Sequence, residues 1–149
     1  MKYEQKMLLG REKGLNPLLY KKKDLDMKEN KHVVLYVDDD QDMLDVVRIV
    51  LEANGFIMEE ALSAESGLKK YKQCSPDFVL VDLMMEEVDS GINCVKELRL
   101  LGNKVPVFML STVGDSLHDI TNYAQLGLAG IFQKPVDPEK LLKALRSKI

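Results

Sequence analysis

The stretch VLYVDDDQDM, residues 34–43, decides the fold, because an apolar run passes directly into three consecutive carboxylates. An apolar run of this length is typical of a buried strand. The next apolar residues recur at helical spacing up to the stop signal ANG at 53–55. They are Met43, Val46, Val47, Val50 and Leu51. The stretch therefore predicts a strand and then a helix, with repelling acids between them that require a nearby positive charge.

The same alternation continues to the C-terminus. Further strands are predicted at 56–61, 77–82, 105–111 and 129–133. Helices are predicted from about 63, over 92–102, around 117–124 and from 138, where Asp137 is the expected cap of the last helix. The residues expected to face inward on the second, fourth and fifth helices are Ala64, Leu68, Tyr71, Leu117, Ile120, Tyr123, Ala124, Leu141, Leu142 and Leu145.

Five strand–helix units predict an α/β fold with a doubly wound parallel sheet, because each right-handed crossover lays a helix on the sheet. Ligands of such sheets bind beyond the carboxyl ends of the strands, where the strand order reverses. The residues at those ends are therefore the candidates for chemistry.

Composition favours one globular domain after a basic tail. The chain has 149 residues, of which 46% are hydrophobic and 30% charged. No apolar run approaches the roughly 18 to 20 residues of a membrane span, and the N-terminus lacks a secretory signal, so a cytoplasmic protein is expected. Cys74 and Cys94 are too far apart in the sequence for a CxxC motif, and no zinc site or disulfide scaffold is indicated.

Charge divides the chain near residue 32. Residues 1–32 carry nine Lys and Arg against five Asp and Glu, whereas the remainder carries twelve against nineteen. We interpret 1–31 as a basic, flexible tail and 32–149 as the folded domain. The alternative interpretation of the tail is a docking arm for an acidic or membrane partner.

Acids, a hydroxyl group and a lysine are expected to meet at one edge of the sheet. The first strand ends in Asp38, Asp39 and Asp40, the third in Asp82, the fourth in Ser111 and Thr112, and the fifth leads to Lys134 and Pro135. Each feature alone is more commonly a helix cap or an ordinary strand end. Their convergence at one edge of the sheet favours a functional site there.

Such a cluster suits phosphoryl transfer. Clustered carboxylates need raised pKa values or a cation, and oxygen ligands of this kind suit Mg²⁺. A carboxylate beside Mg²⁺, a lysine and a hydroxyl group can attack a phosphoryl group, because these neighbours neutralise the charge on its oxygens. The product would be an aspartyl phosphate.

Four motifs carry a resemblance to a known family: VLYVDDD, VDLMM, VFMLSTVGD and GLAGIFQKPVD. In this order and spacing they are similar to the receiver domain of two-component response regulators over about 32–149. The resemblance implies a flavodoxin-like fold, with five helices and a five-stranded sheet of order 2-1-3-4-5. It also implies a cytoplasmic signalling domain rather than an enzyme, with at most self-phosphorylation from phosphodonors and slow self-dephosphorylation.

The resemblance implies a role for each site residue. Asp82 would be the phosphoacceptor, and Asp38, Asp39, Asp82 and the backbone carbonyl group of Met84 would hold Mg²⁺. Ser111 and Lys134 would contact the phosphoryl oxygens, with a cis peptide bond between Lys134 and Pro135. Thr112 falls where the family has a small residue.

Three departures from the family pattern stand out. Glu86 and Glu87 replace the usual Pro-Gly, and the loop VDSGIN is one residue longer. Ile131 occupies the usual aromatic switch position, with Phe132 beside it. Met84 and Val113 occupy the positions that screen the attacking water, which predicts a long-lived phosphoryl group.

The implied partners are a histidine kinase or phosphotransfer protein and a downstream protein, with phosphorylation-dependent dimerisation as an open alternative. No output domain is expected after the fifth helix, and direct DNA binding is not expected for an acidic domain. Two other functions stay open. One is a Mg²⁺-dependent haloacid dehalogenase-type phosphatase that uses Asp38 and Asp40, and the other is a degenerate receiver that works without phosphorylation.

Overall fold

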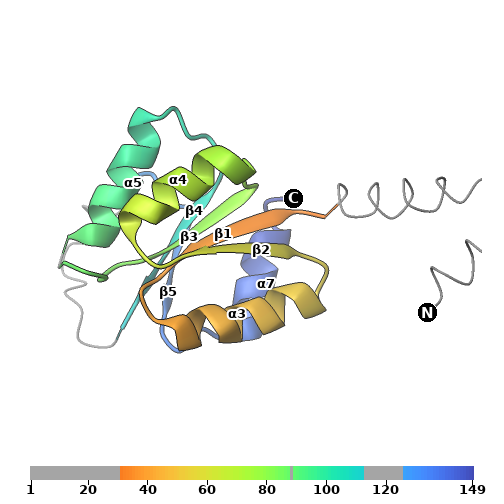
Figure 1. Ribbon diagram of the computed structural model, residues 1–149. Coiled ribbons are helices and arrows are strands. Elements are labelled where there is room, and N and C mark those ends of the chain that lie inside the picture. The colour runs from red at the N-terminus through yellow and green to blue at the C-terminus, as the bar shows by residue number, and fades with distance from the viewer. Residues whose placement is uncertain (1–30, 88, 113–125) are drawn as a thin grey trace, which may run out of the picture. The chain divides into compact units, whose positions relative to one another are not determined.

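A five-stranded parallel sheet forms the centre of the protein (Figure 1). The computed structural model describes residues 31–87, 89–112 and 126–149. The strand order is β2-β1-β3-β4-β5, which confirms the predicted flavodoxin-like order. The strands are β1 (Val33–Val37), β2 (Ile57–Ala61), β3 (Phe78–Asp82), β4 (Val107–Ser111) and β5 (Gly130–Gln133).

Helices cover both faces of the sheet. The structure describes α3 (Gln41–Ala53), α4 (Ala64–Cys74), α5 (Ser90–Leu100) and α7 (Pro138–Arg146). Figure 1 shows α4 and α5 on one face and α3 and α7 on the other. The predicted helix around 117–124, Val113 and the predicted tail up to residue 30 lie outside the described residues.

Side-chain caps fix where three of these helices begin. The Asp40 carboxylate accepts hydrogen bonds from the backbone N–H groups of Asp42 and Met43, and Ser63 forms a reciprocal capping box with Ser66. Asp137 caps α7, with proline at its first position as predicted. The cap at Asp40 turns the chain sharply after β1, so that the preceding acids stay at the end of the strand.

The central strands are buried on both faces. On β3, Phe78 and Leu80 join the core beneath α3 and α7, whereas Val79 and Val81 join the core beneath α4 and α5. Because successive strand residues point to opposite faces, a continuous apolar run is what such a strand requires. The predicted inward residues Leu141, Leu142 and Leu145 of α7 are buried.

One predicted helix face was partly wrong. On α3 the buried residues are Leu44, Val47 and Leu51, whereas Val46 is 56% exposed and Met43 only half-buried. At 3.6 residues per turn, Leu44 shares a stripe with Val47 and Leu51, whereas Val46, about 200° around the helix from Leu44, lies outside that stripe.

The start of α5 packs directly against the end of β3. The backbone N–H group of Gly91 donates to the carbonyl oxygen of Leu83 at 3.2 Å. A Cβ atom at position 91 would lie 2.2 Å from the carbonyl oxygen of Asp82 and 2.6 Å from that of Leu83. Glycine is therefore required here for close approach, and it holds the chain immediately after Asp82.

Replacement of this glycine should destabilise the protein. A helical Gly→Ala change ordinarily stabilises by about 0.5–1 kcal/mol, but Gly91→Ala would force the backbone apart and should cost about 1–3 kcal/mol. Urea denaturation measures the difference. Asn93→Ala, an exposed change on the same helix, is the control and should stay within about 0.5 kcal/mol. An unchanged or increased stability of Gly91→Ala would contradict the close packing.

Candidate functional site

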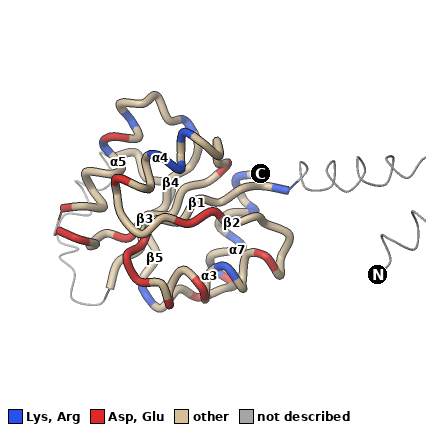
Figure 2. Tube along the Cα trace, viewed as in Figure 1, with Lys and Arg blue, Asp and Glu red and all other residues tan. Residues whose placement is uncertain are grey.

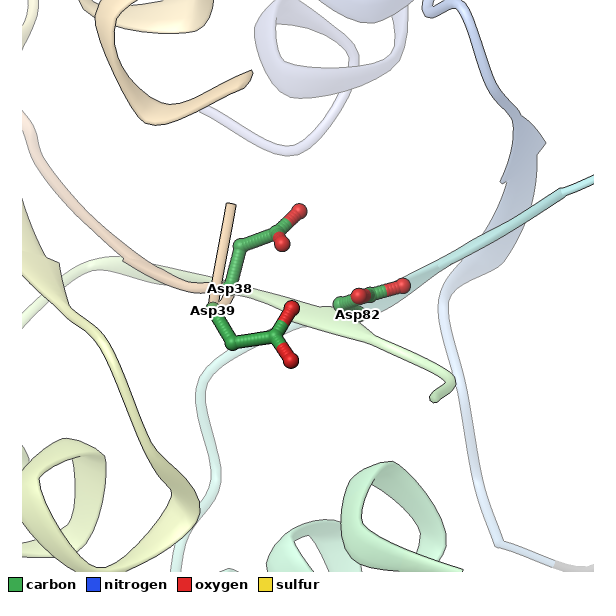
Figure 3. Close-up of side chains that lie close together, drawn as sticks. All are labelled: Asp38, Asp39 and Asp82. Carbon is green, nitrogen blue, oxygen red and sulfur yellow. The ribbon is translucent and has the colours of Figure 1, made fainter. Parts of the chain in front are cut away.

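Three carboxylates meet where two neighbouring strands end (Figure 3). The parallel register pairs Val37 of β1 with Val81 of β3, so the next residues, Asp38 and Asp82, lie side by side. Carboxylate oxygens of Asp38, Asp39 and Asp82 lie within 4.8 Å of one another. Asp38 is 0% and Asp82 5% exposed, whereas Asp39 is exposed. Two of the three acids are thus withdrawn from solvent.

The Lys134 ammonium group enters this cluster from the end of β5. Its Nζ atom lies 2.7 Å from Oδ2 of Asp38 and 3.3 Å from Oδ2 of Asp82. The Lys134–Pro135 peptide bond is cis as predicted, and the Lys134 backbone N–H group donates to the Ser111 carbonyl oxygen at 2.7 Å. The backbone after β5 is thereby tied to β4 while the side chain reaches across the ends of two strands.

The electrostatics of the cluster favour a further cation. The pKa of Asp82 is raised to about 7, because burial and, next, the negative charge of Asp38 raise it more than Lys134 lowers it. Burial lowers the pKa of Lys134, but its hydrogen bond to Asp38 and the charges of Asp38 and Asp82 outweigh this and leave the pKa raised. One ammonium group therefore faces three carboxylates, which is an excess of negative charge.

This donor set fits Mg²⁺. It offers only oxygen atoms, and the exposed Asp39 carboxylate accepts no hydrogen bond from the parts of the chain that the structure describes. Figure 2 shows further acidic positions where β1 passes into α3. Asp40, however, is engaged in capping α3 and does not belong to the cluster.

The other predicted site residues lie around the cluster. Asp82 pairs with Leu110 in the sheet register, so Ser111 follows one position further along β4, and it is buried. Thr112 is exposed, and Met84, two residues after Asp82, is 41% exposed. Glu86 and Glu87 are exposed in the loop before α5, and Glu86 accepts a hydrogen bond from the backbone N–H group of Ala64 at 3.1 Å. This contact ties the acidic loop to the start of α4.

Ile131, at the usual switch position, and its neighbour Phe132 lie in different environments. Ile131 is 37% exposed. Phe132 instead packs against Phe108, with ring centroids 5.5 Å apart, and borders the core beneath α3 and α7. The aromatic ring next to the usual switch position therefore belongs to the core.

One site residue was missed in the sequence. The buried hydroxyl group of Tyr36 donates a hydrogen bond of 2.5 Å to Oδ2 of Asp38. Burial, together with the hydrogen bond and charge of Asp38, raises the pKa of Tyr36 well above its usual range. A tyrosine two residues before an acid on a strand lies on the same face as that acid, and this spacing was the available signal.

Comparison with known proteins identifies the family. The sequence model of the response regulator receiver domain matches residues 34–146. The chain belongs to the response regulator receiver family. It is 30% identical over 119 residues to the chemotaxis protein CheY of Bacillus subtilis (strain 168), a match that covers 79% of this chain and 98% of that protein.

Longer relatives and solved structures agree with this assignment. The receiver is 32% identical over 124 residues to the probable transcriptional regulator ycf27 of Guillardia theta, covering 83% of this chain and 47% of that protein. It thus spans less than half of that regulator. The chemotaxis response regulator CheY4 of Vibrio cholerae superposes with a TM-score of 0.71 at 29% identity, covering 80% of this chain and 100% of that one. A putative response regulator from Chloroflexus aurantiacus J-10-fl superposes with a TM-score of 0.71 at 27% identity, covering 79% of this chain and 97% of that one.

Receivers are signalling domains of two-component systems, and phosphorylation and Mg²⁺ dependence are typical of them. The acidic cluster of this receiver could hold such an ion. None of the helices in 31–87, 89–112 and 126–149 is long and apolar enough to cross a membrane.

The raised pKa of Asp82 predicts a pH-dependent cost in stability without divalent cations. Its folded-state pKa of about 7 exceeds the ordinary 3.8, so its contribution to stability is present below pH 4 and is lost as the pH rises through 7. Asp82→Asn removes this loss and should be more stable at pH 8, by on the order of 1–4 kcal/mol. Near pH 5 the advantage should largely vanish. Thermal unfolding in EDTA at both pH values measures it.

The exposed Asp45 of α3 provides the matched control. Asp45→Asn should show no such pH-dependent gain. A gain for Asp82→Asn that is the same at pH 5 and pH 8 would contradict the burial of an ionisable Asp82 in this cluster.

Proposed function

We propose that Asp82 accepts a phosphoryl group from a phosphohistidine of a histidine kinase or phosphotransfer protein in the cytoplasm. The observation that carries this proposal is the meeting of Asp38, Asp39, Asp82 and Lys134 at the ends of β1, β3 and β5. The family membership supports it, because aspartate phosphorylation is typical of receivers.

The chain's own residues supply the nucleophile and its surroundings. A carboxylate oxygen of Asp82 attacks phosphorus, the bond between phosphorus and the donor imidazole nitrogen breaks, and the electron pair leaves with the imidazole. Mg²⁺, held by Asp38, Asp39, Asp82 and the carbonyl group of Met84, would supply positive charge to the transferring oxygens. Burial of Asp82 strengthens every electrostatic interaction at the reacting atoms.

Lys134 and Ser111 stabilise the product. Lys134 already lies 3.3 Å from Asp82, so the added phosphoryl oxygens come within reach of its ammonium group. Ser111, buried at the end of β4, donates its hydroxyl group to another phosphoryl oxygen. Both residues lie on the β4–β5 side of the sheet, so contacts with the phosphoryl group bias this side between two conformations.

We infer that the signal leaves through protein–protein contacts. The folded part of the chain carries an excess of acids over bases, which opposes direct contact with nucleic acid phosphates. A downstream protein that binds the phosphorylated conformation shifts the same equilibrium. Dimerisation of the phosphorylated receiver would act in the same way.

The phosphatase alternative is less well supported. It needs Asp40 as an acid beside Asp38, but the Asp40 carboxylate accepts hydrogen bonds from two N–H groups at the start of α3. The degenerate receiver differs from the proposed function only in the absence of phosphorylation, so the same experiment tests both.

Treatment with acetyl phosphate and Mg²⁺ should add one phosphoryl group to the parent chain and none to Asp82→Asn. Intact-mass spectrometry measures the addition, and EDTA should abolish it because the carboxylate excess then stays unneutralised. Equal labelling of the variant would refute Asp82 as the acceptor. No labelling of the parent would support the degenerate receiver, and multiple turnover of p-nitrophenyl phosphate would support the phosphatase.

The phosphoryl group should persist for minutes or longer, because the sequence has the apolar residues Met84 and Val113 at the two positions that screen the attacking water in the family. Removal of the donor, followed by intact-mass spectrometry or stopped-flow measurement, gives the lifetime. Met84→Asn should shorten it, whereas Leu100→Asn, at the exposed far end of α5, should not. A parent lifetime of seconds would refute this expectation.

A further inference from the structure

The buried Asp38 carboxylate has few positions left for a cation. Its Oδ2 atom accepts hydrogen bonds from the Tyr36 hydroxyl group at 2.5 Å and from the Lys134 ammonium group at 2.7 Å. Its Oδ1 atom accepts one from the backbone N–H group of Asp40 at 3.0 Å. An ionised carboxylate has about four lone-pair positions, two on each oxygen. The described residues occupy three of these positions, and the fourth belongs to Oδ1.

The Tyr36 hydroxyl group is held in place by the fold. Tyr36 lies in β1, which pairs with β2 on one side and β3 on the other. It is 0% exposed and packs in the core that also contains Leu44 and Leu141. Because the ring cannot move independently of this core, the hydroxyl group fixes the orientation of the carboxylate.

We propose that Tyr36 is a positioning residue of the cation site. With Lys134, its hydroxyl group occupies Oδ2 of Asp38, so that Asp38 offers Oδ1 alone to a divalent cation. This inference rests on the proposed function, since it assumes that Asp38 is a ligand of Mg²⁺.

Restriction to one oxygen favours Mg²⁺ over Ca²⁺. Mg²⁺ requires near-octahedral geometry with short bonds, whereas the larger Ca²⁺ tolerates irregular coordination and accepts carboxylates through both oxygens. Loss of the Tyr36 hydroxyl group would free a position on Oδ2. Among the described residues, Lys134 would then be the only side chain holding that oxygen, and it has Asp82 as a second acceptor at 3.3 Å. The Asp38 carboxylate could rotate and bind through both oxygens.

Tyr36→Phe tests this proposal, since it removes only the hydroxyl group. Isothermal titration with MgCl₂ and with CaCl₂ at constant ionic strength should show Mg²⁺ binding weakened about tenfold, as is usual for loss of a partner of a metal ligand. Ca²⁺ binding should weaken less, so the preference for Mg²⁺ should fall. The control is Tyr71→Phe, which removes a hydroxyl group that donates to Asn103 Oδ1 at 2.7 Å. It should leave both affinities unchanged.

The outcomes separate this proposal from the proposed function. Absence of Mg²⁺ binding by the parent chain would overturn the proposed function and this inference with it. Binding by the parent and by Tyr36→Phe with equal affinity, or an equal loss for Mg²⁺ and Ca²⁺, would overturn only the role of Tyr36. Unfolding temperatures in EDTA separate a change in stability from a change in cation binding, because a purely structural role would alter only the former.

A measurement on the parent chain avoids any dependence on the variant. The Tyr36 hydroxyl proton is buried, so it should exchange slowly with water and give a separate downfield NMR resonance. The resonance should persist when Mg²⁺ is added, because the ion binds the other oxygen. Its disappearance on saturation with Mg²⁺ would overturn the proposal, since the ion would then have displaced the hydroxyl group from Oδ2.

Discussion

Repulsion among Asp38, Asp39 and Asp82, opposed by the ammonium group of Lys134, is the constraint on which the site depends. Charges this close can share a partly buried site only where compensation reaches them at hydrogen-bond distance. Lys134 achieves this from β5, two strands away from β3 in the sheet order. The hydrogen bond from its backbone N–H group to the Ser111 carbonyl oxygen fixes the backbone from which the side chain extends.

The sheet supplies the rigidity that this arrangement needs. β1 and β3 are adjacent and buried on both faces, so the separation of Asp38 and Asp82 is set by the strand register rather than by a loop. The cap at Asp40 starts α3 directly after the acids of β1, and the close approach of Gly91 holds the chain directly after Asp82. Acids placed by strands, with the chain after them held by a helix cap and a close-packed glycine, keep the cluster together despite its repulsion.

The sequence predicted most of this arrangement, because strands and helix caps follow from local patterns, whereas the strand order was implied by the resemblance to the receiver family. Apolar runs such as FVLV mark strands buried on both faces, and Asp137-Pro138 marks the start of α7. Tyr36 was missed because its partner depends on side-chain reach within the core, although the spacing to Asp38 was visible. The error at Val46 arose because a helical stripe read from apolar residues alone fixes its centre only to within one residue.

The site also illustrates why a functional site with a buried ionisable residue lowers the stability of the fold. Burial, together with the charge of Asp38, leaves the pKa of Asp82 raised to about 7, so at neutral pH the Asp82 carboxyl group ionises less readily in the folded chain than in the unfolded chain. An Asp82 exposed to solvent would avoid this cost but would lose the low-dielectric surroundings that strengthen its interactions with a cation and a phosphoryl group. The same desolvation therefore opposes folding and favours phosphoryl transfer. A cation bound by Asp38, Asp39 and Asp82 would offset this loss of folding stability, because it binds the folded state.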